Sequence, residues 1–241
     1  MTILFVSDLH LSPERPEVTR AFLHFLQQQA SSAKALFVLG DLFEAWIGDD
    51  DTCPTGIQVQ QAFKQLTDQG VALFIQHGNR DFFIGKRFME ATGATLLADE
   101  HLIEYNDENV LVMHGDTLCT DDIDYIRFRK RIRHPFIKFL LLALPLKLRQ
   151  KLANTMRAKS KAANANKPSA IMDVNTNAVD AVMSKHQVKT LIHGHTHRPD
   201  RHQHTNGERI VLGDWHDKGW YVIWDRNGIE LKSFTIAQSP A

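Results

Sequence analysis

Five short motifs rich in Asp, His and Asn constrain the fold of this chain more than any other feature of its sequence. They are Asp8-Leu9-His10, Gly40-Asp41, Gly78-Asn79-Arg80-Asp81, His114-Gly115-Asp116 and Gly194-His195-Thr196-His197. Four of them follow apolar, strand-like runs at residues 3–6, 35–39, 71–75 and 110–113, and the last follows the shorter run 191–192. Because polar residues at the C-terminal ends of buried strands meet at one edge of a sheet, we expect the motifs to converge in space.

The pattern around these motifs predicts a layered α/β fold. Strands and helices alternate in the amino-terminal half, which is typical of that class. The expected strands are 3–7, 35–39 and 71–76, short strands within 95–113, and strands near 188–193, 209–213, 219–225 and 229–235. The expected helices are 16–30, 55–69, 84–92 and a helix from Asp173 to about His186. The length of 241 residues suits one such domain with an insertion.

Residues 123–170 differ in kind from the rest, so we expect a core of residues 1–122 and 171–241 interrupted by a helical insertion. Residues 125–172 contain 13 Lys and Arg and no acidic residue, although the whole chain has a formal net charge of zero. Pro135 and Pro145 are expected to break the helix. Leucines and phenylalanines at 136–148 form an apolar patch too short to span a bilayer. The patch predicts an interfacial element, a hairpin packed on the core, or both on different faces.

The residue types of the motifs indicate a two-metal hydrolase of phosphate esters. Asp8 and His10 are two positions apart, so just past a strand end both can reach one ion. Asp41 is the candidate carboxylate bridge between two ions, while His195 and His197 could serve one metal each. Imidazole and carboxylate ligands suit Mn, Fe, Co or Zn, and no thiolate in the motifs selects Zn.

In their order along the chain, the five motifs resemble the signature D-x-H, G-D, G-N-[HR]-[DE], H-G-D and G-H-x-H of the calcineurin-like metallophosphoesterases. The resemblance implies a four-layer αββα sandwich with two metals at the strand ends. By the same resemblance, the first metal takes Asp8, His10, Asp41 and His197. The second takes Asp41, Asn79, His114 and His195.

Arg80 stands where many members of this superfamily have a histidine that assists the leaving group. An arginine side chain cannot donate a proton at neutral pH, which disfavours an alkyl phosphomonoester as substrate. A phosphoanhydride is favoured instead, because its leaving group is itself a phosphate with a second pKa near roughly 6. Arg80 could clamp phosphate oxygens, or it could simply pair with Asp81.

Longer stretches resemble the UDP-2,3-diacylglucosamine diphosphatases of Gram-negative lipid A biosynthesis. They are residues 40–51, 77–81, 114–122 and 192–199, together with 156–164 and 170–175 in and beside the insertion. The resemblance implies water attack on the phosphorus next to uridine, giving UMP and 2,3-diacylglucosamine 1-phosphate. It also implies two Mn²⁺ per chain and peripheral attachment to the cytoplasmic face of the inner membrane.

The same resemblance assigns the site residues. Asp41, Asn79, Arg80, His114 and His195 are expected to be catalytic. Asn79, Arg80 and His195 are also expected to contact substrate, together with Asp122, Ser160, Asn164 and Lys167, which match family contacts. Arg157 joins this group because it lies on the same face of the expected helix. The apolar part of the insertion can line a groove for two acyl chains.

Two other functions are compatible with these patterns. The basic insertion could bind nucleic acid phosphates in a nuclease of the same superfamily, although its leucines and scarce aromatic residues argue against that partner. A non-catalytic scaffold could use the apolar patch to hold a partner, although the chain retains all seven metal-ligand positions. We expect a monomer. With only two cysteines and no signal segment before the first strand, we also expect a reducing compartment.

Overall fold

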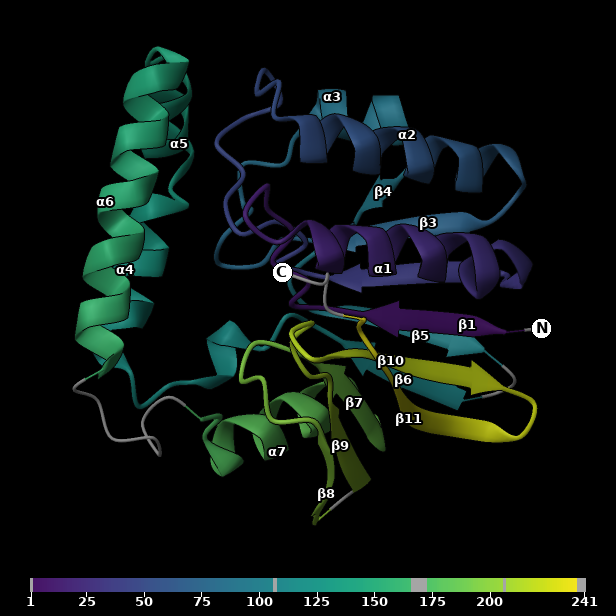
Figure 1. Cartoon of the computed structure of the whole chain (residues 1–241). Coiled ribbons are helices and arrows are strands. Elements are labelled where there is room, and N and C mark those ends of the chain that lie inside the picture. Colours follow the sequence, from purple (N-terminus) through teal and green to yellow (C-terminus); the bar gives the residue numbers. More distant parts are fainter. Residues whose placement is uncertain (1, 106–107, 166–172, 206, 238–241) are drawn as a thin grey trace.

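The computed structural model describes residues 2–105, 108–165, 173–205 and 207–237. These residues form four layers, in which two sheets pack face to face and helices cover both outer surfaces (Figure 1). Helices α1, α2 and α3 lie on the first sheet, whereas α7 lies on the second. The predicted αββα fold class is therefore confirmed.

The first sheet has the strand order β11-β10-β1-β2-β3-β4. Its strands are β1 (Ile3–Val6), β2 (Ala35–Leu39), β3 (Ala72–Gln76), β4 (Thr95–Leu96), β10 (Lys218–Asp225) and β11 (Gly228–Thr235). Strands β1 to β4 run parallel, while β10 and β11 are antiparallel. Every residue of β1 and β2 is buried, because layers cover both faces of a sheet in this position.

The second sheet has the order β5-β6-β7-β9-β8. Its strands are β5 (His101–Tyr105), β6 (Glu108–Val112), β7 (Thr190–His193), β8 (Asp200–His204) and β9 (Gly207–Val211). The three central strands are parallel, and β5 and β8 pair antiparallel at the two edges. Strands β1, β2 and β3 of the first sheet and β6 and β7 of the second all precede one of the five motifs.

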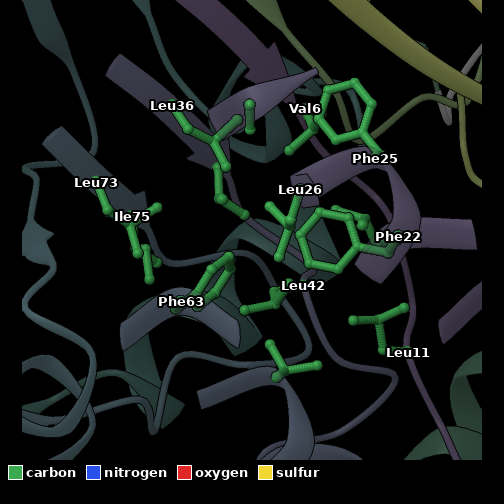
Figure 2. Packing of buried hydrophobic residues seen from close by; sticks show 14 of the residues in the cluster. Val6, Leu11, Phe22, Phe25, Leu26, Leu36, Leu42, Phe63, Leu73 and Ile75 are labelled. Atoms are coloured by element: carbon green, nitrogen blue, oxygen red, sulfur yellow. The ribbon is translucent and has the colours of Figure 1, made fainter. Parts of the chain in front are cut away.

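Three apolar cores separate the four layers. The largest lies between the first sheet and its helices, where Phe22 and Phe63 meet edge to face at 5.8 Å between ring centroids (Figure 2). The second fills the space between the sheets, and the third lies beneath α7. The helices of the sandwich are α1 (Pro16–Gln28), α2 (Pro54–Asp68), α3 (Lys86–Thr92) and α7 (Thr176–His186), with 3₁₀ turns η1 (Ala30–Ser32) and η2 (Asp116–Leu118).

Residues 123–165 form an arm of three helices beside the sandwich (Figure 1). They are α4 (Ile123–Ile132), α5 (Pro135–Leu142) and α6 (Leu146–Ala165), and they break at the two predicted prolines. The most exposed large apolar residues of this α4–α6 arm include Phe136 and Phe139, at 62% and 68%. The prediction that the apolar side chains of a helical hairpin are buried on the core is therefore wrong for most of these side chains. In the described part of the chain, no helix combines the length and hydropathy that a bilayer span needs.

Some expected boundaries are wrong for local reasons. Helix α7 begins at Thr176 rather than Asp173, because the side chain of Asn175 accepts hydrogen bonds from the first-turn amides of Asn177 and Ala178. Strand β8 was not expected at all, because its sequence is polar and it forms an exposed sheet edge. Strand β9 ends at Val211, two residues earlier than expected.

Candidate metal centre

The C-terminal ends of five strands bring the predicted metal ligands to one end of the sandwich. The first sheet contributes residues that follow β1, β2 and β3, and the second contributes residues that follow β6 and β7. The ligands gathered there are Asp8, His10, Asp41, Asn79, His114, His195 and His197. The site thus spans the carboxyl ends of both sheets.

One group of donor atoms surrounds Asp8. His197 Nε2 lies 3.2 Å from Asp8 Oδ1 and 3.2 Å from His10 Nε2. His10 Nε2 lies 3.9 Å both from Asp8 Oδ1 and from Asp41 Oδ2. Four side chains, three of them buried, therefore point their donor atoms at a common space.

A second group shares Asp41 with the first. His114 Nε2 lies 3.9 Å from Asp41 Oδ2 and 3.0 Å from Asn79 Oδ1. His195 Nδ1 also lies 3.0 Å from Asn79 Oδ1. Asp41 therefore lies between the two groups, which is the position expected of a bridging carboxylate.

The backbone at these ligands adopts an unusual conformation. Among the described residues, six that are not glycine have positive φ, and five of them are predicted ligands: Asp8, His10, Asp41, His195 and His197, with φ between 49° and 67°. The left-handed region costs a residue with a side chain roughly 1–2 kcal/mol. Such strain concentrates at functional sites, where the surrounding structure maintains it. Here, amide-to-carbonyl hydrogen bonds from Asp8 to Gly40 and from His10 to Asp41 hold the two loops together.

Two glycines in the motifs are required by close approach. A Cβ on Gly78 would lie 2.1 Å from Asp41 Oδ1, and one on Gly194 would lie 2.1 Å from Asp8 Oδ2. Both distances are far below van der Waals contact. The motif glycines thus leave the space in which the two buried carboxylates sit.

Hydrogen bonds around the ligands fix their orientation. His114 Nδ1 lies 2.9 Å from the carbonyl oxygen of Leu39, which directs its Nε2 at the site. The backbone amide of Arg80 donates to Asp41 Oδ1, and that of His195 donates to Asp8 Oδ2, each at 2.8 Å. Burial alone would raise the pKa of Asp8, but its bond to His197 and the neighbouring histidine charges hold that pKa well below its usual range.

Three of the histidines at the site differ in their proton affinity. Burial lowers the pKa of His195 to about 4, so its imidazole is neutral at physiological pH. Burial also lowers the pKa of His197, but the hydrogen bond and charge of Asp8 outweigh it and raise the value to about 9. Burial opposes protonation of His114 too, yet the charges of Asp41, Asp8 and Asp116 raise its pKa.

The donor set fits divalent cations. Asp8 and Asp41 are 0% and 2% exposed, and no Lys or Arg side chain in the described part of the chain pairs with either. Buried carboxylates need a compensating charge, and among the described side chains only imidazoles form ion pairs with these two. Oxygen and imidazole donors without thiolate suit Mn²⁺ and its neighbours in the first transition row.

Arg80 and Arg157 meet at a residue that was not predicted. Glu44 Oε1 accepts from Arg80 Nη1 at 2.8 Å and from Arg157 Nη2 at 2.5 Å. Its other oxygen, Oε2, lies 3.2 Å from His10 Nδ1. Arg80 therefore does not pair with Asp81, which is fully buried and accepts the amides of Leu42 and Gly78. No motif signals Glu44, because its role depends on partners far apart in sequence.

Of the other predicted substrate contacts, the structure describes three and does not describe the fourth. Asp122 caps α4 and accepts from the amide of Tyr125 at 3.1 Å. Ser160 is exposed on α6, and Asn164 lies one turn further along the same helix. Lys167 lies outside the described residues.

Helix α4 is joined directly to the metal motifs. Asp116 accepts from Tyr125 Oη at 2.5 Å and from Arg129 Nε at 2.6 Å. Arg133 donates to the carbonyl of Gly78 at 2.7 Å, and the ring of Tyr125 stacks on His195 with centroids 6.0 Å apart. Asp116, the last residue of the fourth motif, thus anchors the α4–α6 arm to the site.

Comparison with known proteins agrees with this geometry. The family model of the calcineurin-like phosphoesterases matches residues 1–199. The UDP-2,3-diacylglucosamine hydrolase of Enterobacter sp. (strain 638) is 56% identical over 238 residues, covering 97% of this chain and 99% of the relative. The enzyme of the same name from Pseudomonas putida (strain W619) is 52% identical over 239 residues, covering 98% and 100%.

A solved archaeal phosphodiesterase superposes with a TM-score of 0.50 at 13% identity, covering 98% of this chain and 99% of that one, and it supports the fold alone. The chain belongs to the calcineurin-like phosphoesterase family, and within that family to the group of the UDP-2,3-diacylglucosamine hydrolases. The family resemblance that the motifs predicted is confirmed.

Proposed function

We propose that this calcineurin-like phosphoesterase hydrolyses the pyrophosphate bond of UDP-2,3-diacylglucosamine, releasing UMP and 2,3-diacylglucosamine 1-phosphate. The observation that carries the proposal is a metal-type donor cluster with two arginines beside it and an exposed apolar arm next to both. A diphosphate linked to an acylated sugar needs these three features together. Relatives of nearly equal length carry the corresponding enzyme name.

In this proposal, two Mn²⁺ ions occupy the centre, one held by Asp8, His10, Asp41 and His197 and the other by Asp41, Asn79, His114 and His195. When bound, they would supply Lewis-acid chemistry to the phosphate oxygens and to water. The protein's own contribution is orientation. Hydrogen bonds to His114, Asp41 and Asp8 hold the donor atoms in position before substrate arrives.

Arg80 and Arg157 are the groups that we assign to the diphosphate. A guanidinium remains charged and offers planar N–H donors to phosphate oxygens. In the described part of the chain, each arginine commits one nitrogen, to Glu44, so other donors remain available. Neither arginine can protonate a leaving group, which agrees with a phosphate rather than an alkoxide leaving.

The α4–α6 arm is the part that we assign to acyl chains and to the membrane surface. Its apolar side chains are exposed while Lys and Arg surround them, a pattern of interfacial elements. Phe128, Ile132 and Ile137 line an open apolar groove between α4 and α5. Asp122, Ser160, Asn164 and Lys167 are proposed to contact sugar and phosphate. We further propose a monomer at the cytoplasmic face of the inner membrane that does not bind nucleic acid.

The proposal is tested by turnover of UDP-2,3-diacylglucosamine in ¹⁸O-labelled water with manganese present. Mass spectrometry of both products locates the oxygen that water delivers. Label in the phosphate of UMP is the expected result, because attack is proposed at the phosphorus next to uridine. Label in the sugar phosphate would contradict the direction of attack, and absence of turnover would contradict the substrate.

A further inference from the structure

Glu44 contacts three groups that belong to different parts of the site. It follows β2 and directly adjoins a β-bridge between Leu11 and Phe43, and its own amide donates to the carbonyl of Leu11 at 3.1 Å. His10 comes from the loop after β1, Arg80 from the loop after β3, and Arg157 from helix α6. The side chain of Glu44 is 22% exposed, so it is largely shielded from water.

The contact of both arginines with one oxygen is the informative observation. Guanidinium groups repel each other, yet Arg80 Nη1 and Arg157 Nη2 approach the same Oε1 within 2.8 Å and 2.5 Å. A carboxylate between them offsets that repulsion and leaves the remaining N–H groups free to face a second anion. With two guanidinium groups against one of its oxygens, Glu44 is held as a carboxylate.

The other oxygen of Glu44 faces the metal centre. Oε2 lies 3.2 Å from Nδ1 of His10, a buried nitrogen that has no hydrogen-bond partner among the described residues, while Nε2 of the same ring points at Asp8 and Asp41. A carboxylate on the far nitrogen of a ligand histidine fixes its ring orientation and raises its basicity. Such partners change metal affinity about 10–100-fold when removed.

We propose that Glu44 is a positioning residue with two roles: it orients His10 towards its metal, and it gathers Arg80 and Arg157 into one dicationic pocket for a diphosphate. The second role rests on the proposed function, since it assumes a diphosphate ligand. Through Arg157, Glu44 also couples the α4–α6 arm to the metal centre.

The first role is tested by calorimetric titration of Mn²⁺ into metal-stripped protein. Glu44→Gln keeps the volume of the side chain and removes its charge, and we expect it to weaken the tighter of the binding steps about tenfold. Glu208→Gln is the matched control, because Glu208 is 21% exposed and pairs with Arg201 on β8, away from the site. Equal affinity in both variants would overturn the first role.

The second role is tested with methylenediphosphonate, a diphosphate mimic that cannot be hydrolysed, titrated into manganese-saturated protein. Removing a negative charge beside an anion site should by Coulomb attraction alone tighten binding. Loss of the positioned pocket should weaken it, and we expect Glu44→Gln to bind about fivefold more weakly. Tighter or unchanged binding would overturn the second role.

A double-mutant cycle with Arg157→Ala separates positioning from general damage. If Glu44 acts through Arg157, the loss from Glu44→Gln shrinks to less than twofold in the Arg157→Ala background. An undiminished loss would overturn the assignment to Arg157. The melting temperature of every variant must lie within a few degrees of that of the wild type. If Glu44→Gln does not meet this condition, the cycle is repeated with Glu44→Ala. No assay here uses the lipid, so failure of the proposed substrate leaves the role of Glu44 separately measurable.

Discussion

The metal centre and the α4–α6 arm lie side by side but are held in place by different kinds of interaction. Four of the seven predicted ligands at the centre are buried, five have strained backbone, and neighbouring glycines allow carboxylates to approach the backbone. The arm contains no buried residue in α4 or α5 and exposes large apolar side chains. A buried, over-determined site suits chemistry that needs fixed distances, whereas an exposed apolar element suits contact with lipid.

The arm is connected to the sandwich mainly through polar side chains. Arg129 binds Asp116, Lys138 donates to the carbonyl of Phe82 at 2.6 Å, and Arg149 binds Asp50 and donates to the carbonyl of Ile47 at 2.6 Å. Arg157 adds the contact with Glu44. Hydrogen bonds and ion pairs are directional, so they can set the position of the arm without an extensive apolar interface. Changes at the centre should therefore affect chemistry, and changes in the arm should affect recognition of the lipid.

The largest effect is expected for Asp41→Ala at the centre. This substitution removes the carboxylate that lies between both donor groups, so both cations lose a ligand. We expect kcat to fall about a thousandfold or more. Steady-state kinetics and metal analysis of the purified variant measure the effect. Near-normal turnover would contradict the two-metal assignment.

A smaller but still large effect is expected for Gly78→Ala. The added methyl group would meet Asp41 Oδ1 at 2.1 Å and force the loops apart. Manganese affinity should fall about 100-fold, as for loss of important ligand supports. Gly70→Ala is the control, because its methyl group would meet no atom within 4 Å, so the only strain there comes from its positive φ of 91°. The control should lose stability by about 1 kcal/mol and keep its metal affinity.

Asp116→Asn tests the connection between the two regions. Removing one partner of a buried ion pair should reduce the free energy of unfolding by about 3 kcal/mol at pH 7. Arg129, which pairs with Asp116, also pairs with Asp99, whose side chain is 49% exposed. Asp99→Asn should therefore reduce the free energy of unfolding by less than about 1 kcal/mol. Urea unfolding of metal-stripped protein measures both. Equal losses would show that burial of Asp116 is unimportant.

The pH dependence of this variant follows from the pKa of Asp116. Burial raises that pKa, but the charges of His114, Arg129 and His195 hold it well below its usual range. Its contribution to stability is therefore fully present above the unfolded value of about 3.9 and is lost as pH falls through the lower folded value. The stability difference between wild type and Asp116→Asn should shrink below pH 4. A constant difference down to pH 2 would contradict this reading.

The smallest effect on the fold is expected for joint replacement of Phe136 and Phe139 by Ser. Both side chains are mostly exposed, so the melting temperature should change by no more than about 2 °C. Turnover of acylated substrate presented in detergent should fall about tenfold, because lipid contact is lost. Hydrolysis of a water-soluble UDP-sugar should not change. Equal losses on both substrates would assign these residues to the fold instead.

The sequence predicted which residues gather at the centre, but it did not predict the backbone conformations and contacts that hold them there. Strand ends and ligand types could be read from the five motifs, because hydrophobic runs and polar termini are local patterns. The left-handed backbone of residues such as Asp8 and His195 could not be predicted from the motifs, since this strain depends on the packed neighbours. Glu44 was missed for the same reason: its partners lie 34, 36 and 113 positions away. The polar strand β8 has no apolar alternation to reveal it.

The most direct test of the division between centre and arm is to follow UMP and phosphate release by the manganese-loaded wild-type protein from three substrates. They are UDP-2,3-diacylglucosamine, non-acylated UDP-N-acetylglucosamine and a simple phosphomonoester. Strong preference for the acylated substrate is the predicted result, because we propose that the centre carries out the chemistry and that the arm recognises the acyl chains. Equal or faster turnover of the two simpler substrates would contradict it, leaving a two-metal phosphoesterase whose arm takes no part in choosing the substrate.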